Sequence, residues 1–263
     1  MPETARGADP PPLVLLAHGS PDPRHAEGVE RLARQVGSQL RGVPVSVAYL
    51  QHNRPTLAEA VAQFGAAGGP SPVRVLPLLL TAGGHLADDV PTAVAGAEAA
   101  VPGIVVEPLA PMPAERLAPA VLAAVGRASG TAPGALDEAT LRIVLVTAGS
   151  ERAGAMAPFD ALATAVAAGG AAVSVANGPR SDVDRAVAEV SRSKGGDGFA
   201  VPVMYAQGKL PDIAVDRAAS HGFVATDVVG ALASCAYALA SWVEEQPINP
   251  SRKALGAAPA GPS

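Results

Sequence analysis

Aromatic residues and cysteine are scarce in this chain of 263 residues. Phe, Trp and Tyr supply 3% of the sequence and hydrophobic residues supply 49%, so the core must be built from Ala, Val and Leu. A single cysteine, Cys235, excludes an internal disulfide and fits a reducing compartment. Cys235 lies in an Ala-rich helical pattern, which predicts a small buried side chain.

Basic clusters and long apolar stretches are also missing. The net charge is −5 at pH 7 and no run of Lys or Arg occurs, which argues against nucleic acid as a partner. No stretch is apolar over the ~20 residues that a membrane-spanning helix needs. Residues 1–12 carry neither the basic nor the apolar region of a signal peptide. We therefore expect a cytoplasmic protein that binds neither nucleic acid nor membrane.

Strand and helix signals alternate along the chain, as parallel sheets with helical crossovers require. In the first half the expected strands are 13–17, 45–50, 73–78 and 104–107, and the expected helices are 25–40, 56–67, 86–100 and 113–127. In the second half, 141–150 echoes 13–20 and 199–212 echoes 74–88, with further strands at 171–176 and 222–225 and a last helix at 231–243.

The sequence therefore predicts an α/β fold with two tandem repeats of a parallel four-stranded sheet flanked by helices. The second repeat lacks the chemical motifs of the first, and we call it degenerate. The predicted parts are a disordered N-terminus at 1–12, an N-terminal domain at 13–127, a linker at 128–140, a degenerate C-terminal repeat at 141–245 and a disordered tail at 246–263.

A histidine follows the first expected strand at the point where the strand leaves the sheet. His18 is followed by glycine, serine and two prolines, which predicts a loop at the carboxyl end of a parallel strand, where open α/β folds place their ligands. A Gly-Gly pair and His85 follow the third strand in the same way. Two histidines at one edge of one sheet favour a metal site, and the glycines let backbone approach a bound group closely.

The two halves differ at these histidines. His18 aligns with Ala148 of the second half, and His85 aligns with Lys209. Histidines that only helped folding would be needed about equally in both halves. The asymmetry therefore favours a single active site in the N-terminal half.

Other polar residues near this edge each have two readings. Asp88 and Asp89 can orient the second histidine, feed in a cation or take up protons, or they stabilise the first turn of a helix through its dipole. His52 follows the second strand, where it either faces the site or lies in a solvated loop. His25 and His221 have no partner signal, and we expect both at the surface.

Other chemistries have weaker support. Histidine phosphatases and phosphoglycerate mutases also carry His-Gly after the first strand, but an arginine precedes their histidine, whereas Ala17 precedes His18 here. The chain has no Gly-x-Gly-x-x-Gly after its first strand and no Walker sequence. Ser20 and Ser150 do not lie in the Gly-x-Ser-x-Gly context of a hydrolase nucleophile.

Three stretches of the N-terminal half combine these features. They are Ala17-His18-Gly19-Ser20 with Asp22 and Arg24, Tyr49-Leu50-Gln51 before Pro55, and Leu76-Pro77-Leu78-Leu79-Leu80 through Gly83-Gly84-His85 to Asp88-Asp89-Val90-Pro91. Together they resemble the class II tetrapyrrole chelatases, and among these the sirohydrochlorin chelatases of the SirB and CbiX type. In the C-terminal half the resemblance survives as fold and repeat.

The resemblance implies insertion of Fe²⁺ or Co²⁺, with Ni²⁺ as a further candidate, into sirohydrochlorin or a related tetrapyrrole. Two protons are released, and the product belongs to siroheme or cobalamin biosynthesis. The metal ion is then a substrate, and no organic cofactor is needed. The active cleft is expected between the two halves, in a chain that is a monomer or a homodimer.

The resemblance also implies roles for individual residues. His18 and His85 are expected to hold the metal against one face of the ring, with Asp88 or Asp89 behind the histidine that receives the pyrrole protons. Gln51, a further metal ligand, stands where the family commonly has an acidic residue and offers a carbonyl oxygen without negative charge. The residues expected to bind the tetrapyrrole are Ser20, Arg24, Arg54, Gly83 and Gly84. The alternative for Arg24 and Arg54 is that each is an ordinary surface charge.

The substitution at Gln51 leaves a second function open. The chain is then a metal- or tetrapyrrole-binding carrier that lost turnover together with the acidic residue. A third hypothesis is that the chain is a scaffold that binds no ligand. Turnover beyond one equivalent of sirohydrochlorin distinguishes the enzyme from the carrier.

Overall fold

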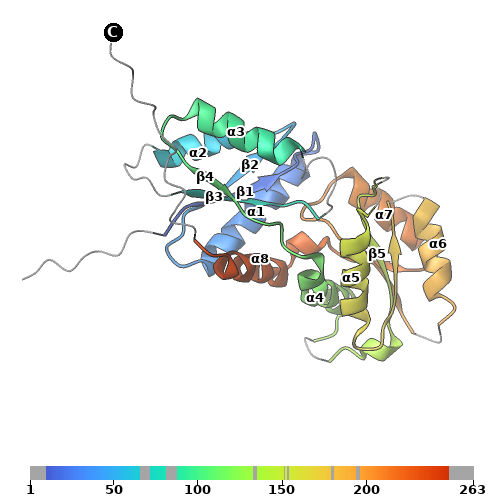
Figure 1. Cartoon of the computed structure of the whole chain (residues 1–263). Coiled ribbons are helices and arrows are strands. Elements are labelled where there is room, and N and C mark those ends of the chain that lie inside the picture. The colour runs from blue at the N-terminus through green and yellow to red at the C-terminus, as the bar shows by residue number, and fades with distance from the viewer. Residues whose placement is uncertain are drawn as a thin grey trace, which may run out of the picture.

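The computed structural model of the chain holds two parallel β-sheets, and helices cover both faces of each (Figure 1). The structure describes residues 10–65, 72–80, 88–132, 135–150, 152, 154–178, 181–193 and 196–248. Of the predicted site residues, Gly83, Gly84 and His85 lie outside these ranges, as do residues 1–9 and 249–263 of the predicted lead-in and tail. Within the ranges, no helix combines the length and the apolar character needed to cross a membrane.

The N-terminal sheet has the strand order β2-β1-β3-β4, with all neighbours parallel. Its strands are β1 (Leu13–Ala17), β2 (Val45–Tyr49), β3 (Val73–Pro77) and β4 (Val106–Pro108). The helices between them are α1 (Pro23–Gln39), α2 (Leu57–Gly65) and α3 (Val90–Ala100).

The C-terminal sheet repeats this topology in the order β6-β5-β7-β8. Its strands are β5 (Arg142–Val146), β6 (Ala172–Ala176), β7 (Gly198–Pro202) and β8 (Val224–Ala225). The helices between them are α5 (Ala157–Ala167), α6 (Ser181–Val190) and α7 (Lys209–Ala219), and a 3-10 turn, η3 (Glu138–Thr140), precedes β5. The predicted fold class, α/β with two tandem four-stranded parallel sheets, is confirmed.

The central strands are buried on both faces, which explains their continuous apolar sequence. In β1, Leu13 and Leu15 belong to the core that contains α1, whereas Val14 and Leu16 pack with residues of α2 and α3 on the other face. β5 divides its side chains between two cores in the same way. This alternation fixes the register of each strand, since a shift by one residue would exchange the two faces.

The last helix of each half packs on the other half (Figure 1). α4 (Ala118–Ser129) lies against α5 and β7, and α8 (Ala233–Glu245) packs against α1. A 3-10 turn precedes each of them, η2 (Ala114–Leu117) and η4 (Val229–Ala231). As a consequence, one hydrophobic core contains buried residues of both sheets and of α1, α4, α5 and α8. This exchange of α4 and α8 between the two halves holds them together as one folded unit.

The helix predicted at 113–127 is therefore divided into η2 and α4. Pro119 lies in the first turn of α4. Proline has no backbone N–H to donate to the preceding turn, so a continuous α-helix across this position would lose a hydrogen bond. The chain instead makes the 3-10 turn first and begins the α-helix at Ala118, where the missing donor is harmless.

A buried arginine fastens the end of α8 to the N-terminal sheet. Arg74 of β3 is 5% exposed and donates hydrogen bonds to the carbonyl oxygens of Val243 (3.2 Å) and Gln246 (3.0 Å). Its Nε lies 4.0 Å from Oε2 of Glu107, and neither of these two buried atoms has a hydrogen-bond partner. Burial lowers the pKa of Arg74, and the charge of Glu107 opposes this shift. Arg74 thus places positive charge at the C-terminal end of α8, where the helix dipole favours it.

Replacing this arginine should lower stability far more than replacing an exposed one. We expect Arg74→Met to lower the free energy of unfolding by about 3 kcal/mol, because Glu107 and two helix carbonyls lose a buried cation. The control is Arg127→Met, since Arg127 pairs with Asp227 at 3.2 Å while both side chains are largely exposed. Its loss should stay below about 1 kcal/mol. Urea unfolding followed by circular dichroism measures both, and equal losses would contradict the role given to Arg74.

Candidate active site

The loop after β1 carries His18 and is held by the loop after β2. The N–H of Gln51 donates to the carbonyl oxygen of His18 (2.9 Å), and the N–H of Ser20 donates to Oδ1 of Asn53 (2.7 Å). Oγ of Ser20 in turn accepts a hydrogen bond from the N–H of Asp22 (3.1 Å), the residue that caps α1. These bonds fix His18 at the carboxyl end of the sheet.

Gly19 is the point at which the two loops approach most closely. Its φ is +94°, a conformation that side chains with a Cβ rarely adopt. A Cβ built on Gly19 would lie 1.8 Å from the carbonyl oxygen of Gln51. Only glycine therefore allows His18 to leave β1 in this direction while the loop after β2 stays in place.

The C-terminal half builds the same loop without the histidine. Gly149 has a φ of +89°, and the N–H of Ser150 donates to Oδ1 of Asn177 (2.8 Å), as Ser20 does to Asn53. Ala148 occupies the position of His18. Our reading of the sequence missed both asparagines. The sequence does contain a pattern that could have predicted their role, because each Asn follows the second strand of its repeat.

A cavity of about 880 Å³ lies between the two halves, next to this loop. The N-terminal half lines it with residues 17–23, His25, Val29 and residues 78–80. The C-terminal half lines it with Ala148, Gly149, Phe159 and residues 203–211. His18 and Ser20 are thus on its wall. Its volume lies within the range of small-molecule and cofactor sites.

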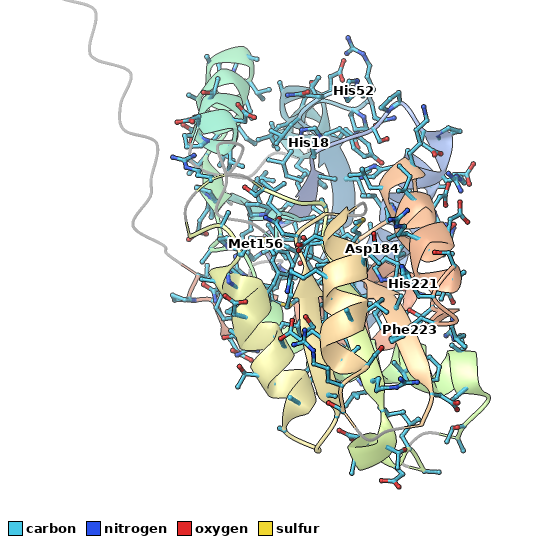
Figure 2. All side chains as sticks on the ribbon, turned by 90° about the vertical axis from the view of Figure 1, so that its right-hand side faces the viewer. His18, His52, Met156, Asp184, His221 and Phe223 are labelled. Atoms are coloured by element: carbon cyan, nitrogen blue, oxygen red, sulfur yellow. The ribbon has the colours of Figure 1, made fainter. Side chains whose placement is uncertain are left out.

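His18 is half-buried and has a hydrogen bond that bears on its chemistry. Its Nδ1 lies 3.0 Å from the carbonyl oxygen of Gly19, which favours the tautomer with the proton on Nδ1. In that tautomer the lone pair that a metal ion uses is on Nε2. The ring centroid of His52, on the loop after β2, is 6.4 Å from that of His18 (Figure 2), but His52 is exposed and is not among the residues that line the cavity.

His25 was expected at the surface, and this expectation is wrong. The first turn of α1 directs its half-buried side chain into the wall of the cavity, and its Nδ1 is buried without a hydrogen-bond partner. The ring centroid of Tyr49 lies 6.5 Å away. Burial lowers the pKa of His25, and the neighbouring His18 acts in the same direction. No local sequence pattern predicts the burial of His25, because the wall of the cavity that faces it comes from the other half of the chain.

His221 is exposed as expected and pairs with Asp184 at 2.7 Å.

Arg24, a predicted ligand of the tetrapyrrole, joins the two halves. Its guanidinium donates to both carboxylate oxygens of Asp22 (3.0 and 2.6 Å) and to both of Asp212 on α7 (3.2 and 2.6 Å). The hydrogen bonds from Arg24 lower the pKa of the Asp22 carboxyl. Two edges of the Arg24 guanidinium are therefore hydrogen-bonded within the protein, one to Asp22 and one to Asp212.

Other predicted site residues lie away from the cavity wall. Arg54 is exposed and pairs with Glu59, and Gln51 and Asp88 are also exposed. None of the three lines the cavity. Among the described residues, no group of three or more His, Cys, Asp or Glu side chains is arranged to hold a metal ion. The roles predicted for these residues, and for His85 outside the described ranges, stay predictions.

Comparison with known proteins relates the N-terminal half to a named family. Residues 12–127 match the family model described as CbiX. Two proteins named sirohydrochlorin cobaltochelatase, from Methanosarcina acetivorans and Methanosarcina barkeri, are 30% and 28% identical to this chain over 79 residues. The matched stretch is 30% of this chain and covers 60% of the length of each relative.

Solved structures share the architecture of the whole chain. SirB from Bacillus subtilis with Fe³⁺ has a TM-score of 0.70 and 19% identity, and the match covers 89% of this chain and 94% of SirB. A CbiX structure, described as the terminal enzyme for siroheme biosynthesis in denitrifying bacteria, has a TM-score of 0.61 and 20% identity over 89% of this chain and 98% of CbiX. At these identities the likeness shows the fold.

The fold is that of the class II chelatases. Within this class, the matches of the N-terminal half confirm the predicted resemblance to chelatases of the SirB and CbiX type.

The close approach at Gly19 can be tested against its counterpart. We expect Gly19→Ala to lower the free energy of unfolding by more than about 3 kcal/mol and to displace His18, because the new Cβ adds a backbone overlap to the left-handed strain. Gly149→Ala meets its nearest atom at 3.2 Å and should lose about 1–2 kcal/mol. Urea unfolding of both variants measures the difference, and a smaller loss for Gly19→Ala would contradict it.

The buried imidazole of His25 should make stability depend on pH. Its pKa is below the ordinary value of 6.5 in the folded protein. As the pH falls below 6.5, the unfolded chain takes up a proton that the folded protein refuses, so the free energy of unfolding falls until the pH reaches the folded pKa.

We expect His25→Asn to remove this part of the pH dependence between pH 7 and 5. His52→Asn is the control, because its exposed position has a φ of +63° that Asn tolerates. Urea unfolding at intervals of pH measures both variants. A wild-type slope retained in His25→Asn would assign the dependence to other groups.

Proposed function

We propose that this protein inserts a divalent metal ion into sirohydrochlorin or a related tetrapyrrole. The observation that carries the proposal is the position of His18, which lies within the CbiX-matched residues 12–127 and on the wall of the cavity between the halves. The metal and the ring are both substrates. The reaction exchanges two pyrrole N–H protons for one M²⁺, so two protons leave.

The volume and lining of the cavity support a large ligand with apolar faces. Leu78, Leu79 and Leu80 from one half and Phe159 and Val203 from the other are among its lining residues. Apolar walls suit the faces of a macrocycle, and a few polar groups suffice to fix its orientation. The volume of about 880 Å³ is ample for part of such a ring to enter while its carboxylate side chains stay near the opening.

The metal is held by imidazole in this proposal. Neutral histidine suits Fe²⁺, Co²⁺ and Ni²⁺, whereas Mg²⁺ and Ca²⁺ prefer carboxylate cages. His18 and His85 are the proposed ligands, and few protein ligands suit a site that must release its metal to the ring. Co²⁺ is favoured by the names of the Methanosarcina relatives, and Fe²⁺ by the siroheme role named for CbiX. The product then serves cobalamin or siroheme synthesis.

The other predicted residues take secondary places. Ser20 stays a candidate for binding the ring because it lines the cavity. Arg24 contributes by joining the halves at Asp212, since four of its five N–H donors are bound to Asp22 and Asp212. Asp88 or Asp89 is still proposed to stand behind the histidine that receives the pyrrole protons. A cytoplasmic location fits the single buried thiol of Cys235.

A turnover assay tests the proposal. Purified protein with a tenfold excess of sirohydrochlorin and Co²⁺, Fe²⁺ or Ni²⁺ under anaerobic conditions should convert many equivalents, as followed by the absorbance of the metallated ring. His18→Ala and His85→Ala should each lower the rate more than about a hundredfold, because removing a metal ligand is at least as severe as removing a residue that orients one.

The control is His221→Ala, whose ring is exposed and pairs with Asp184 outside the cavity. Its rate should match the wild type. Near-normal rates in both active-site variants would remove the role given to these histidines. A stoichiometric absorbance change without turnover would identify a carrier instead of an enzyme.

A further inference from the structure

We propose that Lys209, in the degenerate C-terminal half, binds a carboxylate of the tetrapyrrole. This inference rests on the proposed function and adds to it a substrate-binding role for the second half. It makes Lys209 the residue that sets the position of the ring relative to His18. Three features support it, namely the place of Lys209 in the cavity, the charges around it and its relation to His85.

Lys209 lies on the wall that the C-terminal half contributes to the cavity. It is the first residue of α7, and the segment 203–211 that contains it lines the cavity continuously. His18 lines the same cavity from the other half. A ring that enters this cavity therefore meets a histidine from one half and a lysine from the other.

Among the described residues that line the cavity, Lys209 is the one Lys or Arg side chain. It is exposed, and no described residue makes an ion pair with it within 4 Å. The neighbouring Arg24 is held by Asp22 and Asp212. The charge of Lys209 reaches Asp22, whose pKa is lowered chiefly by Arg24 and to a smaller extent by Lys209. Lys209 is thus the cation that a ligand carboxylate can use.

A polycarboxylate needs such a cation here. The protein carries a net charge of −5, which repels an anionic ligand at long range. Lysine attracts a carboxylate as a point charge and tolerates many approach directions. The first N–H groups of α7 add positive potential at the same place, because they precede the first intrahelical bond, from Asp212 to Gly208.

The repeat explains why a lysine stands at this position. Lys209 is the counterpart of His85 in the aligned halves. A protonated amine has no lone pair for a metal ion, so this side of the cavity cannot compete with His18 for the cation. The same ammonium attracts the carboxylates at the edge of the ring. The exchange of imidazole for ammonium converts a metal-binding position into an anion-binding one.

The test compares two substitutions at this position. Lys209→Met keeps the length of the stem and removes the charge, and Lys209→Arg keeps a charge. Metal-free sirohydrochlorin is titrated into each protein at low and high salt, with absorbance as the signal. We expect Lys209→Met to weaken binding about tenfold at low salt and to reduce the salt dependence, and Lys209→Arg to stay within about threefold of the wild type.

In turnover, Lys209→Met should raise KM for sirohydrochlorin more than it lowers kcat. Co²⁺ binding measured without the ring should be unchanged. The control is Arg192→Met, an exposed cation outside the cavity, which should bind sirohydrochlorin like the wild type. Equal thermal unfolding of all variants shows that they are folded.

The outcomes separate the two proposals. Wild-type binding by Lys209→Met, or a loss of Co²⁺ binding in that variant, overturns the role of Lys209 while an active wild type keeps the proposed function. A wild type that binds sirohydrochlorin but inserts none of the three metals overturns the proposed function, and the binding titration still decides whether Lys209 holds a carboxylate.

Discussion

The close approach of two backbone loops at Gly19 fixes the position of His18 at the carboxyl end of the N-terminal sheet. The loop after β1 passes so near to the carbonyl of Gln51 that no Cβ fits, and the hydrogen bond from Ser20 to Asn53 holds it there. His18 immediately precedes this contact, so backbone geometry fixes the point from which its ring projects. The C-terminal half uses the same device at Gly149 and Asn177. The loop contact made by glycine and asparagine therefore belongs to both repeats, whereas the histidine is present in the first repeat alone.

A site between two halves also needs the halves to stay in one arrangement, and the exchanged helices provide this. α8 completes the cover of the N-terminal sheet and α4 that of the C-terminal sheet, so neither sheet buries its inner face without the other half. Arg74 fixes the end of α8, and Arg24 bridges α1 to Asp212 of α7. The large apolar contact supplies most of the stability, because exposed ion pairs such as that of Arg24 contribute little. The ion pair instead links α1 of one half to α7 of the other.

Much of this fold follows from the sequence, because alternating apolar runs and glycine-rich ends are local signals. The strands at 13–17 and 73–77 were predicted almost residue for residue, and the repeat predicted two four-stranded parallel sheets. The exchange of α4 and α8 was not predicted, since the apolar face of a helix does not state which sheet it covers. His25 was missed for the same reason: its environment includes a wall that lies in the other half. The partner of Arg24, Asp212, is 188 positions away and leaves no pattern near Arg24.

Duplication within one chain allows two walls of one cavity to diverge in chemistry while they keep the same backbone. In a symmetric pair of identical halves, every histidine that faced the ring would be met by its own copy, and a metal ion would have equivalent sites on both faces. Here Ala148 and Lys209 stand where the first half has His18 and His85, although the loops of Gly19 and Gly149 remain alike. Because the loop geometry is set by glycine and asparagine, the side chains beside it were free to change without loss of the fold. The two walls of the cavity therefore differ in chemistry, with the imidazole of His18 on one and the ammonium of Lys209 on the other. Under the proposed function, the metal would bind at the wall with His18 and a carboxylate of the ring at the wall with Lys209, so the ring would enter in one orientation.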